Sequence, residues 1–105
     1  MKFEKTFGDT VKKLREDKNL SLREVALALN IDTSMLGKIE KNKRKPTKPL
    51  IGKFAEYFNV SATDLVIAFI SDSIVHTIMD EEALSKEVFK IAEKKVKYLK
   101  KQKTS

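Results

Sequence analysis

The sequence predicts an all-α fold of five helices followed by a C-terminal helical extension. Apolar residues recur at intervals of three and four along the chain, and no stretch shows the alternation typical of a β-strand. Two of the expected helices open with a capping-box pattern, a serine followed three positions later by an acidic residue. Asparagine follows four of the expected helix ends.

The first two helices are defined by an apolar face and by a capping pattern. The first helix ends near Asn19, and its apolar face consists of Phe3, Phe7, Val11 and Leu14. The second begins after Ser21, whose side chain can cap the amide of Glu24 while Glu24 reaches back to the amide of Ser21. It stops at Asn30.

The next helix follows so closely that the pair predicts a helix-turn-helix. After a turn of about three residues, Asp32 can cap a third helix that runs to about Lys41. A fourth helix follows Thr47, with Pro49 in its first turn, where the missing N–H is no loss. Its inward-facing residues are Ile51, Phe54, Ala55 and Phe58.

A fifth helix and a last helix complete the chain. The fifth starts at a second capping-box pattern, Ser61 and Asp64. Its apolar residues are Leu65, Phe69, Ile70, Ile74 and Ile78. A break near 79–82 precedes the last helix, whose apolar residues are Leu84, Val88, Ile91, Ala92, Val96 and Leu99.

Four asparagines are expected to end helices. They fall just past the proposed helix ends, where the backbone often turns left-handed, and asparagine is the best choice there after glycine. The chain has only three glycines. The four positions are Asn19, Asn30, Asn42 and Asn59.

The composition excludes several classes of function. Among 105 residues there is no cysteine and one histidine, His76, so neither a disulfide nor a zinc site can be built. No Gly-rich phosphate loop or nucleophile motif is present, so we expect no enzyme activity and no cofactor. The longest apolar run, 65–70, is much shorter than a membrane span, so we expect a soluble, cytoplasmic protein.

The net charge of +7 is concentrated in two clusters. The first 83 residues carry 14 basic and 13 acidic side chains, whereas residues 84–105 carry eight basic and two acidic ones. Within the first part, residues 38–48 hold six basic side chains and one acidic one. A basic cluster can mark a nucleic-acid site, although many charge runs are only solvated surface.

Residues 14–65 resemble the phage-repressor class of helix-turn-helix proteins, the Cro/C1 or XRE family. The matching residues keep one register: Leu14, Arg15, Leu20, Ser21, Val25, Ala26, Leu29, Ile31, Leu36, Ile39, Glu40, Pro46, Ile51, Ala55, Phe58, Val60 and Leu65. The resemblance implies a five-helix, lambda-repressor-like DNA-binding domain over residues 1–66. It also implies that Glu40 braces this domain, with Arg15 as its expected partner.

Three features depart from the family pattern, and one of them is benign: asparagine replaces the usual glycine at the helix ends, and it also tolerates a left-handed backbone. The family usually has glutamine where this chain has Leu22, so one polar DNA contact is in doubt. A polar residue is common inside the third helix, where this chain has Gly37. Glycine there costs helix stability of about 1 kcal/mol relative to alanine, but it leaves room for a base or a backbone to approach closely.

The resemblance implies that the third helix reads DNA in the major groove. Leu36 and Ile39 turn inward, and the polar residues of the helix project on the opposite side. Met35 either joins the DNA contacts or belongs to the core. The expected base contacts are Thr33, Ser34, Gly37 and Lys38. The expected phosphate contacts are Arg23, Lys41, Asn42, Lys43, Arg44 and Lys45.

Residues 67–105 are expected to form a separate dimerisation module with a basic tail. Their apolar stripe is too long to cover a small five-helix domain alone, so part of it is expected to meet a second copy of the chain. The alternative is packing back onto the fifth helix. The expected interface consists of Ile74, Ile78, Leu84, Val88, Ile91, Val96 and Leu99.

These features predict a homodimeric, sequence-specific transcriptional regulator that reads a two-fold operator in double-stranded DNA. The simplest role is a repressor, which occludes RNA polymerase or contacts it. A phage-type or autoregulatory repressor and a restriction–modification controller both fit. Two other hypotheses stay open: the antitoxin of a toxin–antitoxin pair, whose C-terminal segment binds the toxin, and a non-specific nucleoid or RNA-binding protein.

Overall fold

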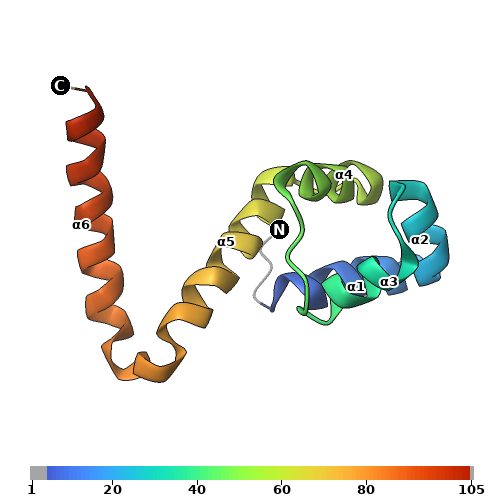
Figure 1. Ribbon diagram of the computed structural model, residues 1–105, viewed down its shortest axis with the longest axis horizontal. Helices are drawn as coiled ribbons and strands as arrows, with labels where there is room; N and C mark the ends of the chain where they lie inside the picture. Colours follow the sequence, from blue (N-terminus) through green and yellow to red (C-terminus); the bar gives the residue numbers. More distant parts are fainter. Residues whose placement is uncertain (1–4, 105) are drawn as a thin grey trace. The chain divides into compact units, whose positions relative to one another are not determined.

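The computed structural model describes residues 5–104, which are almost entirely helical and contain no strand (Figure 1). The all-α prediction is confirmed, including the break before the last helix. The elements are α1 (Phe7–Asp17), α2 (Leu22–Leu29), α3 (Thr33–Glu40), α4 (Lys48–Phe58), α5 (Ala62–Ile78), the 3-10 helix η1 (Met79–Leu84) and α6 (Ser85–Thr104).

The chain divides into two compact units after Ser73 rather than after residue 66. The predicted boundary is too early because the first half of α5 belongs to the N-terminal unit. Ala68 is buried in its core. Asp72 Oδ2 accepts a 2.7 Å hydrogen bond from the backbone N–H of Phe7. The resemblance ends at residue 65, so it gave no sign of these two contacts.

The predicted helix caps are confirmed with one exception. Ser21 Oγ accepts from Glu24 N at 3.0 Å and Glu24 Oε1 accepts from Ser21 N at 3.4 Å, which completes the capping box of α2. Thr47 caps α4, and Ser61 Oγ accepts from Asp64 N. Asp32 occupies the N-cap position of α3, but its exposed side chain makes no capping hydrogen bond.

All four predicted asparagine stops have left-handed backbone conformations. The φ angles are 56° at Asn19, 57° at Asn30, 60° at Asn42 and 54° at Asn59, and no other non-glycine residue among those described has a positive φ. Asparagine tolerates this region because its short polar side chain can bond locally. These four asparagines therefore mark where α1, α2, α3 and α4 end.

One core joins α1 to the first half of α5. Phe7 lies near its centre, with its ring edge-on to Phe54 and to Phe69 at centroid distances of 6.1 and 5.9 Å. Leu14 and Ile31 are partly buried against it, and Phe3 lies outside the described residues. The core residues are Phe7, Val11, Val25, Ala26, Leu29, Leu36, Ile39, Leu50, Ile51, Phe54, Ala55, Phe58, Leu65 and Ala68.

The helical stretch 62–103 is long and apolar enough, by length and composition alone, to cross a membrane. The expectation drawn from the longest apolar run had excluded such a segment. Core helices of soluble proteins that are mostly buried pass the same test, but only 11% of the apolar window in this stretch is buried. Leu65 and Ala68 are buried there, and Asp72 holds the N-terminus of α1. The first half of α5 is thus committed to the folded unit.

A buried ion pair between Arg15 and Glu40 joins α1 to α3. Arg15 Nε lies 2.8 Å from Glu40 Oε2, and Arg15 Nη2 lies 3.0 Å from Glu40 Oε1. Arg15 Nη1 also donates to the carbonyl of Leu20 at 2.8 Å, which fixes the turn before α2. The two side chains are only 12% and 5% exposed. The hydrogen bonding of the Arg15 guanidinium to the carboxylate of Glu40 raises the pKa of Arg15 above its ordinary value. The partner implied by the resemblance is confirmed.

Gly8 allows α1 to approach the end of α3 more closely than any other residue could. A Cβ atom at this position would lie 2.5 Å from the carbonyl oxygen of Glu40 and 2.6 Å from that of Ile39. Both obstacles are backbone atoms, which cannot rotate away. At Gly37 and Gly52, by contrast, an added Cβ would meet nothing within 4 Å.

We predict that Gly8→Ala lowers the free energy of unfolding by about 2 to 3 kcal/mol or more, because α1 and α3 must separate to admit the methyl group. The matched control Gly52→Ala should raise stability by about 0.5 to 1 kcal/mol, since alanine is favoured over glycine inside an open helix. Urea unfolding followed by circular dichroism measures both. Equal stabilities for the two variants would contradict the close approach of α1 to α3.

We predict that Arg15→Ala costs about 3 to 5 kcal/mol of stability, because it leaves the carboxylate of Glu40 buried and unpaired. The control is Lys13→Ala, which removes a 3.3 Å ion pair with Asp17 between side chains that are 74% and 59% exposed. That change should cost no more than about 0.5 kcal/mol. Thermal unfolding of both variants compares the pairs, and a small loss for Arg15→Ala would argue against a bracing role.

Candidate nucleic-acid interface

The helix-turn-helix consists of α2, a tight turn and α3. Asn30, in its left-handed conformation, ends α2, and its N–H donates to the carbonyl of Leu27 at 3.2 Å. The N–H of Ile31 donates to the carbonyl of Ala26 at 3.0 Å. These bonds satisfy carbonyls that the end of a helix leaves open, and they fix the direction in which the chain enters α3.

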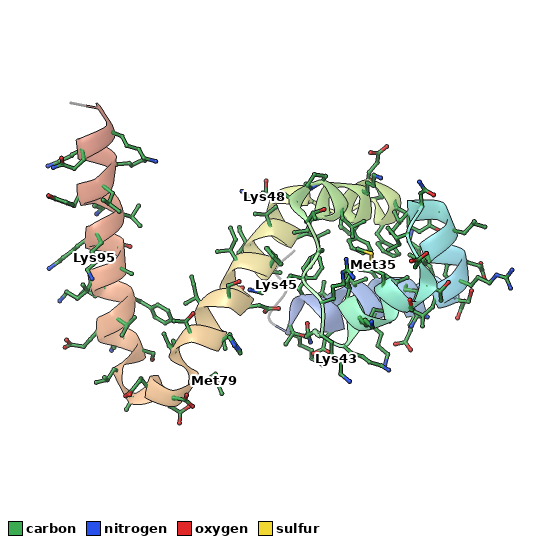
Figure 2. All side chains as sticks on the ribbon, viewed as in Figure 1. Met35, Lys43, Lys45, Lys48, Met79 and Lys95 are labelled. Atoms are coloured by element: carbon green, nitrogen blue, oxygen red, sulfur yellow. The ribbon has the colours of Figure 1, made fainter. Side chains whose placement is uncertain are left out.

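Helix α3 has a buried face and an exposed face, as predicted. Leu36, Ile39 and Glu40 are buried. Met35 packs against the core, on the side of α3 that faces α4 (Figure 2), so it belongs to the core rather than to the exposed face. The predicted base-contact residues Thr33, Ser34 and Lys38 are exposed together on the opposite side, and Gly37 is half-buried between them. The structure brings these four residues onto one surface.

Gly37 has no structural reason to be glycine. Its φ is not positive, and a Cβ added to it would meet nothing within 4 Å. Glycine inside a helix nevertheless costs about 0.5 to 1 kcal/mol relative to alanine. The fold of the domain would therefore accept alanine at position 37.

A basic loop follows α3. We use this name for residues 41–45, all of which are exposed. The N–H of Lys43 donates to the carbonyl of Lys38 at 2.8 Å, so the loop starts in a fixed direction. The side chains of Lys43 and Lys45 project from it (Figure 2). After the loop, Pro46 is buried.

Asn42 differs from the other predicted phosphate contacts because its side chain bonds within the domain. Its Oδ1 accepts from Gly8 N at 2.9 Å, and its Nδ2 donates to Thr6 Oγ1 at 2.9 Å. Its amide is therefore engaged with the start of α1 instead of projecting with the lysines. The sequence indicated a helix stop and a phosphate contact at Asn42, since nothing in it shows that the start of α1 lies next to this position.

The start of α2 shows how the departure at Leu22 is accommodated. Arg23 is exposed, as a phosphate contact would require. Leu22 is half-buried and packs against the core. The polar contact expected at this position in the family is replaced by apolar packing, so Arg23 is the cation that the start of α2 presents.

Helices α5 and α6 each carry exposed apolar residues. Ile67, Ile70 and Ile74 follow one another at spacings of three and four and are 59%, 46% and 43% exposed. Ile78 is half-buried. Between residues 86 and 103 of α6 every side chain is exposed. The exposed apolar residues of η1 and α6 are Met79, Leu84, Val88, Phe89, Ile91, Val96, Tyr98 and Leu99.

No candidate metal site is found in the part of the chain that the structure describes. No three histidine, cysteine, aspartate or glutamate side chains lie close enough there to hold an ion. The side chains that gather on the candidate interface are hydroxyls and cations instead. Such groups can donate hydrogen bonds to base edges and to phosphate oxygens.

The comparisons with known proteins agree with this geometry. A family model described as helix-turn-helix, HTH_3, matches residues 11–65. The restriction-modification controller protein C.AhdI from Aeromonas hydrophila has a similar structure, with a TM-score of 0.53 and 29% identity over 56% of this chain and 89% of that one. An HTH_3 family transcriptional regulator from Vibrio cholerae is also similar in structure, with a TM-score of 0.51 and 29% identity over 56% of this chain and 33% of that one.

A third similar structure covers more of the chain at lower identity. It is a complex of the SinR and SinI proteins, with a TM-score of 0.53 and 23% identity over 95% of this chain and 100% of that one. At this identity the likeness concerns the fold alone. No curated protein sequence matches the chain.

Proposed function

The chain belongs to the HTH_3 helix-turn-helix family, and from that premise we propose that it is a sequence-specific transcriptional regulator that reads a two-fold operator as a homodimer. One observation carries the proposal. Helix α3 is anchored through Leu36, Ile39 and Glu40. Its polar residues Thr33, Ser34 and Lys38 are exposed. A helix held in this way fits the major groove of DNA, which is about 12 Å wide.

The exposed face of α3 supplies the base contacts. The hydroxyls of Thr33 and Ser34 can donate or accept, and the Thr33 methyl group can touch a thymine methyl. Lys38 can donate to O6 and N7 of guanine. Gly37 adds no side chain between them, so a base edge or the DNA backbone can approach the helix there. The helix cost of this glycine is then offset by the fit to DNA.

The basic loop and Arg23 supply contacts to phosphates. Lys41, Lys43, Arg44 and Lys45 are exposed and lie at or just after the end of α3. A protein that neutralises phosphates releases counterions from DNA, so each such contact adds affinity that falls as salt rises. These residues hold the protein in register, while α3 discriminates the sequence.

The second copy of the chain docks, in this proposal, on apolar residues that α5 and α6 each expose. On α5, Leu65, Ala68 and Asp72 face the domain, and Ile67 with Ile70 faces solvent. Exposed apolar area of this extent is unfavourable in water, and a two-fold partner would cover it. Helix-turn-helix dimers commonly place two recognition helices one DNA turn apart, about 34 Å.

The regulator acts without chemistry. Bound to its operator in the cytoplasm, it would block RNA polymerase or contact it, and repression of its own promoter is the simplest arrangement. A second candidate, the antitoxin of a toxin–antitoxin pair, is favoured by one observation. Every side chain described between 86 and 103 of α6 is exposed, which leaves its apolar residues open to a different protein.

The experiment that tests the proposal is fluorescence anisotropy on the duplex upstream of the protein's own gene, against a shuffled duplex of the same composition, over a salt series. A preference of about 10³ or more near physiological salt would establish specific recognition. Equal, salt-labile binding to the two duplexes would argue against this operator. A toxin that forms a stoichiometric complex through α6 would favour the second candidate.

We predict that Lys38→Ala and Arg44→Ala weaken binding in different ways. Loss of Lys38 should relax the preference at one or two base pairs by about 1 to 3 kcal/mol, because a bidentate contact to guanine is removed. Loss of Arg44 should weaken binding to all sequences alike and reduce the salt slope by about one charge. Competition with single-substituted duplexes separates the two effects, and unchanged sequence preference in Lys38→Ala would remove it from the base contacts.

We predict that Ile74→Lys raises the dissociation constant of the homodimer more than tenfold, because it places an unpaired charge within an apolar interface. Leu27→Lys is the matched control. Leu27 is 81% exposed on α2, away from the proposed interface, so this variant should dimerise like the wild type. Sedimentation equilibrium of both variants gives the comparison. A wild-type chain that is monomeric at high concentration would contradict the dimer.

A further inference from the structure

The first turn of α1 is held by side chains from three separate segments. The N–H groups at the start of a helix have no partner within it. In α1, Phe7 N donates to Asp72 Oδ2 of α5 at 2.7 Å, and Gly8 N donates to Asn42 Oδ1 of the basic loop at 2.9 Å. Asp9 N donates to Thr6 Oγ1 at 3.1 Å. This helix start therefore connects α5 with the loop that follows α3.

Asn42 is attached at both ends of its amide. Its oxygen accepts from Gly8 N, and its nitrogen donates to Thr6 Oγ1 at 2.9 Å. Between described residues, these are the side-chain hydrogen bonds that tie the basic loop to another helix. The missing Cβ of Gly8 makes them reachable, since a Cβ there would lie 2.6 Å from Asn42 Oδ1.

The side chain of Asn42 does more than stop a helix. Its backbone is left-handed, with φ of 60°, and glycine would adopt this conformation at least as readily. Asparagine adds one acceptor and one donor that bind α1, and it brings no charge into a loop whose other members are cations. An aspartate could accept the same bond from Gly8, but its negative charge would oppose phosphate.

We propose that Asn42 is a positioning residue for DNA binding, which fastens the basic loop to the first turn of α1 so that Lys43, Arg44 and Lys45 meet the phosphates in a fixed register. The inference rests on the proposed function. The first turn of α1, to which Asn42 bonds, is itself held to α5 by the bond from Phe7 N to Asp72. The basic loop is therefore attached to a part of the domain that is already fixed. A loop that is ordered before binding loses less conformational freedom when DNA binds.

The test compares Asn42→Gly with Asn59→Gly in the full-length protein. Both keep a residue that tolerates a left-handed backbone at a helix end, but Asn59 ends α4, away from the basic loop. The probes are a 30-base-pair duplex of mixed sequence, which reports phosphate contacts without knowledge of the operator, and the duplex upstream of the gene. Affinity is measured over a salt series, and thermal unfolding is measured alongside.

Asn42→Gly should bind both duplexes at least about fivefold more weakly near 0.1 M salt, with a salt slope reduced by about one phosphate contact. Asn59→Gly should match the wild type in slope. If Asn42→Gly binds within twofold of wild type with an unchanged slope, the positioning role is overturned. Failure of the wild type to bind either duplex would overturn the proposed function and, with it, this inference. The two failures are thus distinguishable.

A second pair of variants leaves the basic loop untouched. Thr6→Val removes the acceptor of Asn42 Nδ2, whereas Thr6→Ser keeps the hydroxyl. We expect a weaker affinity and a smaller salt slope for Thr6→Val and wild-type behaviour for Thr6→Ser. Thr6→Val also removes the acceptor of the Asp9 N–H, which Thr6→Ser keeps, so thermal unfolding of both variants is measured as well. Equal salt slopes for the two would overturn the inference even if Asn42→Gly failed to fold.

Discussion

The buried ion pair between Arg15 and Glu40 is the interaction on which the rest of the N-terminal unit depends. It fastens α3 to α1 and, through the carbonyl of Leu20, it also holds the turn from which α2 starts. A buried pair of this kind adds little net stability compared with apolar packing, but it requires one geometry. That requirement fixes α3 at its C-terminal end, next to the basic loop, which contacts phosphates in the proposed complex.

Around this pair, α1 packs against α3 too closely for a side chain to fit between them. A Cβ of Gly8 would lie 2.5 to 2.6 Å from the carbonyl oxygens of Glu40 and Ile39, and Asn42 bonds to the same turn of α1. Helix α1 therefore supports α3. Its sequence looked like an ordinary amphipathic helix because the spacing of apolar residues reports a buried face, not the element that covers it.

The surfaces left open by this packing divide into two kinds. The polar face of α3 and the basic loop can exchange water for the polar groups and charges of DNA. The apolar residues that α5 and α6 expose can exchange water for another apolar surface, which a second protein chain supplies in the proposed dimer. The N-terminal unit carries polar and apolar exposed surface alike. Its apolar part includes Ile67 and Ile70, which lie on the half of α5 whose other face is in the core.

The sequence by itself determined the helices, their stops and the two faces of α3. Caps and left-handed asparagines are local, so Ser21 with Glu24 and the four asparagines could be predicted without knowing any partner. Only the tertiary structure decided contacts between residues far apart in the chain. Asp72 reaches Phe7 across 65 positions and Asn42 reaches Gly8 across 34, and these contacts extended the domain to Ser73 and turned Asn42 inward. Their geometry arises when helices pack, so no local pattern could reveal it.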